Sequence, residues 1–154
     1  MVSPLSQPVP QTISFRVEGM APQPQGSKRH LGNGVLIESC KLVKPWRYLV
    51  CQAAIATGAE LIRGPLRMEV QFLFARPKGH YNAKGQLRPA APAVHCVRPD
   101  GSKLLRSTED ALTGVLYDDD ARIVSSSWEK RYCVGDERPG AIITLGPILT
   151  AQPI

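Results

Sequence analysis

The sequence predicts an α+β fold, with a small mixed β-sheet and two main helices packed on it. Two patterns lead to this prediction. Some segments alternate apolar and polar side chains, which is typical of half-buried strands, and others repeat apolar side chains at helical spacing. The 154 residues, 43% of them hydrophobic, fit one domain with a buried core. We expect a single domain over residues 12–147, between flexible tails at 1–11 and 148–154.

Five segments are expected to be strands. Met68–Phe74 alternates most clearly, with Glu69 and Gln71 between its apolar residues. The first strand is expected from Ile13 and to end at Gly19. The remaining candidates are Val35–Glu38, Arg122–Glu129 and Ala141–Leu145.

Two segments are expected to be helices. The first begins at Pro45, where the missing N–H of proline is tolerated, and ends at Gly58. The second is expected to have Ser102 as its N-cap and to run to about Val115. The predicted order of elements is therefore β-β-α-β-α-β-β, with the helices on one face of the sheet.

Two segments are expected to be loops. The first, Ala21–Arg29, carries adjacent cations. The second, residues 76–101, is rich in Gly, Pro and basic side chains. An irregular segment of that length inside one domain is usually functional.

The charge balance favours a polyanionic partner. There are 19 Lys and Arg residues against 13 Asp and Glu residues, a net charge of +6. No apolar stretch approaches the roughly 20 residues of a membrane span, and the N-terminus lacks the layout of a signal peptide. Four cysteines without CxxC spacing indicate neither a zinc site nor a disulfide framework. We therefore expect a cytoplasmic protein with no membrane partner.

Acidic residues flank the second predicted helix. Asp100 precedes it, and the triplet Asp118–Asp120 follows it. A helix of 13 residues is about 20 Å long, so these carboxylates converge only if the strands before and after them are neighbours in the sheet. If they converge, their oxygen ligands select Mg²⁺ or Mn²⁺, a cation suited to phosphodiester hydrolysis. The alternative is that both acidic segments are solvated turns.

A set of ordered motifs resembles the RusA family of Holliday-junction resolvases. The family pattern is approximately PDxDNLxK, then DALxG, then DDxQVV, then a lysine. This sequence has RPDGSKLLR at residues 98–106, DALTG at 110–114 and DDARIV at 119–124, and Lys130 fits the last position. Upstream, FRVEG at 15–19, QGSKR at 25–29 and KPWR at 44–47 resemble the N-terminal half of phage-type members.

The resemblance implies a homodimeric, Mg²⁺-dependent endonuclease that nicks four-way DNA junctions during recombination and repair, with Mn²⁺ as a possible substitute. By position, Asp100, Asp119 and Asp120 match metal-binding, catalytic aspartates, and Arg106 replaces a functional lysine. A twofold dimer would supply two symmetric nicks. The candidate DNA-binding cations are Lys28, Arg29, Arg47, Arg98, Lys103 and Lys130. The long loop, with Arg76, Lys78, Lys84 and Arg88, is expected to contact DNA or flank the dimer.

Ser102 is the main departure from the family pattern, because the family places a second catalytic aspartate there. A serine hydroxyl is neutral and a weak metal ligand. Either Asp118, Asp119 or a water compensates, or the protein is a catalytically weakened RusA-like protein that binds junctions. A third hypothesis is a general basic interaction module. His95 either assists at the site or is a bystander.

Overall fold

A computed structural model describes residues 11–26, 28–30, 32–34, 36–38 and 41–148. Residues 1–10 and 149–154 of the two predicted tails lie outside the described residues, as does Val35 at the start of one predicted strand. Within the described part of the chain, no helix is both long and apolar enough to cross a membrane.

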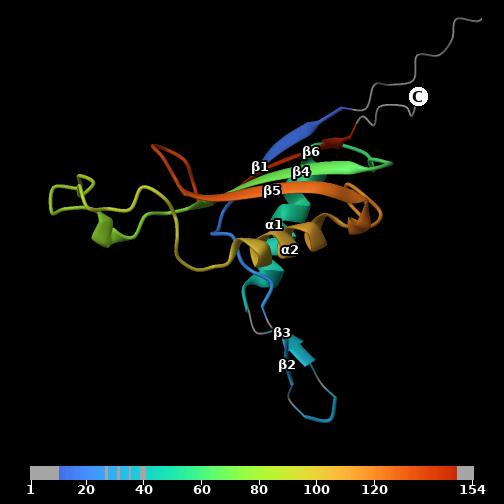
Figure 1. Ribbon diagram of the computed structural model, residues 1–154, viewed down its shortest axis with the longest axis horizontal. Coiled ribbons are helices and arrows are strands. Elements are labelled where there is room, and N and C mark those ends of the chain that lie inside the picture. The colour runs from blue at the N-terminus through green and yellow to red at the C-terminus, as the bar shows by residue number, and fades with distance from the viewer. Residues whose placement is uncertain (1–10, 27, 31, 35, 39–40, 149–154) are drawn as a thin grey trace, which may run out of the picture.

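A four-stranded mixed sheet forms the centre of the domain, as predicted (Figure 1). Its strands are β1 (Ile13–Glu18), β4 (Leu66–Phe74), β5 (Ile123–Tyr132) and β6 (Gly140–Pro147), in the spatial order β1-β6-β4-β5. β6 is antiparallel to both of its neighbours, and β4 and β5 are parallel. A parallel pair needs a long crossover, and here that crossover contains every predicted catalytic residue.

Both main helices, α1 (Val43–Ala56) and α2 (Gly101–Leu112), cover the same face of the sheet (Figure 1). Apolar side chains from one face of β4 pack against the stripes of both helices, because alternate residues of a strand point to the same side. The core includes fully buried Trp46, Val50, Met68, Phe72, Leu104, Leu112, Tyr117 and Ile143. The α+β prediction is therefore confirmed.

The N-cap of α2 is Asp100, and the prediction of Ser102 was wrong. The Leu104 N–H donates to the carbonyl of Asp100, so the helical hydrogen bonds begin two residues earlier than expected. Ser102 lies inside the first turn. The helix ends at Leu112 rather than Val115, because Thr113 is extended and Gly114 has a φ of 83°.

The helix α1 begins two residues before Pro45, at Val43. The first i→i−4 bond of α1 runs from the Trp46 N–H to the Leu42 carbonyl, so the missing N–H of Pro45 removes no helical bond. An additional strand, β2 (Lys28–His30), begins at the end of the segment predicted as the first loop and pairs with β3 (Leu36–Glu38). These two strands form a separate hairpin, so the strand predicted at 35–38 is not part of the central sheet. Positive φ values at Gly32, Asn33 and Gly34 allow the hairpin to turn, and the two glycines are the sequence signal that the predicted elements did not use.

Residues 75–99, which we call the arm, extend away from the end of β4 (Figure 1). Their only helical element is the short 3₁₀ helix η1 (Lys78–His80), so the predicted long loop is confirmed. The arm is nevertheless ordered by its own contacts. Asn82 Oδ1 accepts hydrogen bonds from the N–H groups of Lys84 and Gln86, each at 2.9 Å, and Tyr81 forms a β-bridge with Leu87.

Candidate functional site

Asp100 lies where the arm returns to the domain and α2 begins. Its side chain is 61% exposed, and its carboxylate is 3.9 Å from Lys103 Nζ. A carboxylate in this position is open to solvent and to a ligand, with a cation beside it. Of the predicted acidic residues, Asp100 is the one at the N-terminal end of α2.

The strand β5 holds the backbone on both sides of Asp100. Lys130 Nζ donates to the carbonyls of Val97 and Pro99, at 2.7 and 2.9 Å. On the other side, Gly101 packs so closely on Trp128 that a Cβ atom would collide with the indole ring. Trp128 and Lys130 are two residues apart on one strand and therefore project from the same face.

The triplet of aspartates follows α2 and forms local contacts. Asp118 pairs with Arg122, whose hydrogen bond lowers the pKa of the Asp118 carboxyl. Asp119 Oδ1 accepts a hydrogen bond from the Ala121 N–H at 2.8 Å and caps the short 3₁₀ helix η2 (Asp120–Arg122). Asp118 and Asp119 are thus part of a turn that leads into β5.

Asp120 lies near the last turn of α2. Burial raises the pKa of Glu109, and the negative charge of Asp120 raises it further. Arg106, an exposed residue one turn before Glu109, acts in the opposite direction and lowers that pKa. Asp120, Glu109 and Arg106 therefore share one electrostatic environment at the C-terminal end of the helix.

A single chain does not bring Asp100 and Asp120 together. They lie at opposite ends of α2, whose 12 residues span about 18 Å. The strands β4 and β5 are neighbours, as convergence requires, but they are parallel. Asp100 lies between residues that contact Trp128 and Lys130 in the second half of β5, whereas Asp120 precedes the start of that strand. Among the described residues, no group of three or more His, Cys, Asp or Glu side chains is arranged to hold a metal ion.

The predicted DNA-binding cations differ in their solvent exposure and in their contacts within the protein. Arg98 is exposed, and Lys103 is about half exposed. Arg47 donates to Gln25 and lies 3.4 Å from the Asp110 carboxylate, so it joins α1 to α2. Lys130 is engaged by two carbonyls. Lys28 and Arg29 belong to β2, and the structure does not describe their side chains.

His95 lies at the base of the arm, not on its surface. It is 8% exposed and stacks on Phe74 with ring centroids 4.0 Å apart. Tyr132 packs beside it, and Arg76 lies over the Tyr132 ring. Burial and the nearby Lys130 charge lower the pKa of His95, which favours the neutral imidazole. This burial was not predictable from sequence patterns, because it depends on where the arm returns to the sheet.

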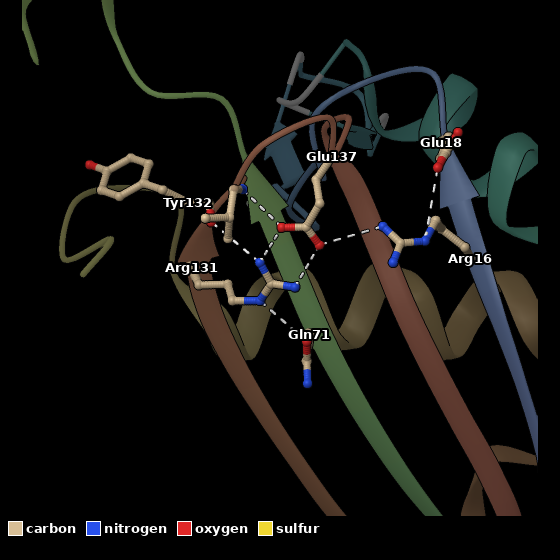
Figure 2. Close-up of polar contacts among 7 residues, drawn as sticks. Arg16, Glu18, Gln71, Arg131, Tyr132 and Glu137 are labelled. Atoms are coloured by element: carbon tan, nitrogen blue, oxygen red, sulfur yellow. Dashed lines mark hydrogen bonds and ion pairs between the residues drawn. The ribbon is translucent and has the colours of Figure 1, made fainter. Parts of the chain in front are cut away.

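An ion-pair network joins one end of the sheet (Figure 2). Glu137, in the turn between β5 and β6, accepts two hydrogen bonds from Arg131, at 2.7 and 2.8 Å, and pairs with Arg16 at 3.6 Å. It also accepts from the Val134 N–H. These contacts, chiefly those from Arg131, lower the pKa of Glu137 to about 2. The network links β5 to β1 and is structural.

These features define an α+β protein with exposed carboxylates at both ends of one helix and an arm that carries five Lys or Arg residues and no acid. Residues 19–146 match the family model described as Endodeoxyribonuclease RusA. The chain therefore belongs to the RusA endodeoxyribonuclease family of Holliday-junction resolvases, and the resemblance found in its motifs is confirmed. A search of curated proteins found no match.

Proposed function

We propose that this protein is a cytoplasmic endonuclease that resolves four-way DNA junctions by paired nicks, as a homodimer that uses Mg²⁺ or Mn²⁺. The observation that carries the proposal is the exposed Asp100 carboxylate, fixed at the start of α2 in a chain whose residues 19–146 match the RusA family. Recombination and repair are the processes in which such an activity is used.

The donor chemistry suits a hard divalent cation, but one copy of the chain does not gather the donors. Carboxylate oxygens are the ligands that Mg²⁺ and Mn²⁺ prefer. We infer that a second copy supplies the missing carboxylate. If the two α2 helices lie antiparallel across a twofold axis, Asp100 of one copy approaches Asp120 of the other. In this arrangement each dimer contains two equivalent sites.

The residues of the chain have distinct roles in this proposal. Asp100, Asp119 and Asp120 would hold the cation, which polarises the scissile phosphate when it is bound. Arg106 offsets negative charge at the end of α2 where Asp120 lies, and its guanidinium suits contact with a phosphate oxygen. Arginine is a poor proton donor, so we assign Arg106 an electrostatic role.

The arm is proposed to contact the backbone of the junction. Its charged side chains are all cationic, and none of its 25 residues is Asp or Glu. Cations that neutralise phosphates supply affinity and orientation without reading sequence. This suits a protein that recognises the shape of a junction. Arg98 and Lys103, next to Asp100, are further candidates for phosphate contacts.

Mixing two inactive variants tests the proposal. Asp100→Asn and Asp120→Asn are each expected to abolish nicking of a labelled four-way junction in Mg²⁺ or Mn²⁺. After the two variants are mixed and exchange subunits, each heterodimer has one site with both wild-type aspartates, so nicking is expected to return in part. Asp136→Asn, an exposed acid in the turn after β5, is the control and keeps full activity.

Each outcome has one meaning. If the wild-type protein binds junctions but never nicks them, the nuclease assignment is wrong. If it nicks and the mixture stays inactive, the site is not shared between copies. If it nicks as a monomer in sedimentation experiments, the dimer is excluded.

The second candidate function is a catalytically weakened protein that binds junctions. The observation that favours it is Ser102, an exposed side chain in the first turn of α2 that replaces a family aspartate with a neutral hydroxyl. Tight binding of junction DNA without nicking would support this function. Equal affinity for a junction and for a linear duplex would instead support a general basic interaction module.

A further inference from the structure

We propose that Lys130 is a positioning residue that fixes the Asp100 carboxylate, and not a phosphate contact. The inference rests on the proposed function, because it assigns Lys130 a part in the same site. It changes the role that the sequence suggested for this lysine. Lys130 acts through the backbone of the segment that enters α2.

The contacts of the Lys130 ammonium group carry the inference. Nζ donates to the carbonyls of Val97 and Pro99, at 2.7 and 2.9 Å, and Pro99 immediately precedes Asp100. Two of the three ammonium hydrogens are thus used within the protein. The lysine belongs to β5, where it is paired in register with the fully buried Phe72 of β4. A strand of the main sheet, at its edge, therefore holds a residue of the arm.

A second contact from the same strand completes the restraint. Gly101 packs against the ring of Trp128, two residues before Lys130. The backbone is thus held at Val97 and Pro99 on one side of Asp100 and at Gly101 on the other. The Asp100 side chain itself stays 61% exposed. This combination, a fixed backbone with a free carboxylate, is what a ligand of a reacting group requires.

The Lys130 ammonium group is bonded to the end of the arm, at Val97 and Pro99. Burial lowers the pKa of the nearby His95, and the Lys130 charge lowers it further. Arg98, in contrast, is exposed and belongs to the segment that Lys130 holds. Arg98 lies between the two residues whose carbonyls accept hydrogen bonds from Lys130, yet the two cations are expected to differ in function. Arg98 is therefore the matched control.

The test compares Lys130→Met with Arg98→Met. Junction affinity is measured in EDTA, where no nicking occurs, over a range of salt concentrations. Removing a phosphate contact reduces the slope of log K against log[salt] by about 0.9. We expect Lys130→Met to keep the wild-type slope and Arg98→Met to reduce it.

Nicking and hydrogen exchange measure the positioning itself. Lys130→Met is expected to lower the rate of nicking of bound junction by about 10- to 100-fold, since small misplacements of reacting groups have effects of this size. Exchange of the Leu104 and Leu105 amides, in the first hydrogen-bonded turn of α2, is expected to become faster. Arg98→Met should leave that exchange unchanged. A reduced salt slope, with exchange and nicking rate unchanged, would overturn the inference.

Two further results separate this inference from the proposed function. If the wild-type protein does not nick junctions, the proposed nuclease function is wrong. Hydrogen exchange and the salt slope of junction binding still decide the role of Lys130 in that case. If Lys130→Met does not fold, Lys130→Arg replaces it. The arginine variant keeps the positive charge. A positioning role therefore predicts slower nicking with an unchanged slope of log K against log[salt]. Wild-type values of the nicking rate, the salt slope and the amide exchange would overturn the inference.

Discussion

Ser102 has an exposed hydroxyl two residues beyond Asp100, in the first turn of α2. Ser102→Asp is expected to increase nicking of junction DNA, because it adds a carboxylate beside the proposed metal ligand. A negative charge in the first helical turn also stabilises α2, by about 0.3–1 kcal/mol. The nicking rate and the thermal unfolding midpoint are the two measurements.

Ser102→Asn provides the control for that change. It has nearly the same shape as the aspartate variant and no charge. If the aspartate and asparagine variants nick at equal rates, the missing carboxylate does not limit the enzyme.

Glu137 makes stability depend on acidic pH. Its pKa of about 2 in the folded protein lies below the ordinary value of 4.5. The contribution is therefore fully present above about pH 4.5 and is lost as the pH falls toward 2. Glu137→Gln is expected to flatten the stability profile in this range and to lower the free energy of unfolding at pH 7 by at most about 1 kcal/mol, since the pair is near the surface. Denaturant unfolding at several pH values measures this.

The comparison for Glu137 is Glu60→Gln, which changes an exposed acid between α1 and β4. The free energy of unfolding of this variant should depend on acidic pH in the same way as that of the wild-type protein. A Glu137→Gln profile that also keeps that shape would contradict the role assigned to the Arg131 contact.

At the level of elements, the contact between α2 and β5 depends on the absence of a side chain at Gly101. Gly101→Ala is expected to force the start of α2 away from Trp128, lower the free energy of unfolding by about 1–3 kcal/mol and reduce nicking. Trp128 fluorescence and chemical denaturation measure the change. Gly79→Ala, in η1, meets no atom within 4 Å and is expected to leave both values near wild type.

The elements also show what sequence patterns can predict. Alternation located β4, and helical spacing located α1, because both patterns come from one buried face. The cap of α2 was misplaced, since Asp100 and Ser102 are both good N-cap residues two positions apart. The separation of Asp100 from Asp120 was not predictable, because a strand pattern does not specify whether its neighbour is parallel. The hydrogen-bond acceptors of Lys130 were not predictable either, since they depend on the path of the arm.

At the level of the whole molecule, charge is distributed so that the arm is purely basic. The double change Lys78→Gln and Lys84→Gln is expected to reduce the salt slope of junction binding by about 0.9 for each cation that contacts a phosphate. Fold stability should be unchanged, because both side chains are exposed. Junction titrations in EDTA provide the measurement.

Arg67→Gln is the matched change for the arm. Arg67 is an exposed cation on β4, outside the arm. We expect the Arg67→Gln variant to bind junctions with the same slope of log K against log[salt] as the wild-type protein. If the arm variant also keeps the wild-type slope, the arm does not bind the DNA backbone.

The position of β6 has a consequence for synthesis of the protein. This strand is the last of those that the structure describes, yet it lies between β1 and β4 and bonds to both. The strand β1, which is synthesised long before β6, therefore has no partner in the sheet until residues 140–147 have emerged. Nascent chains that stop before this point would expose two unpaired strand edges, so the central sheet would be completed only after translation has passed β6.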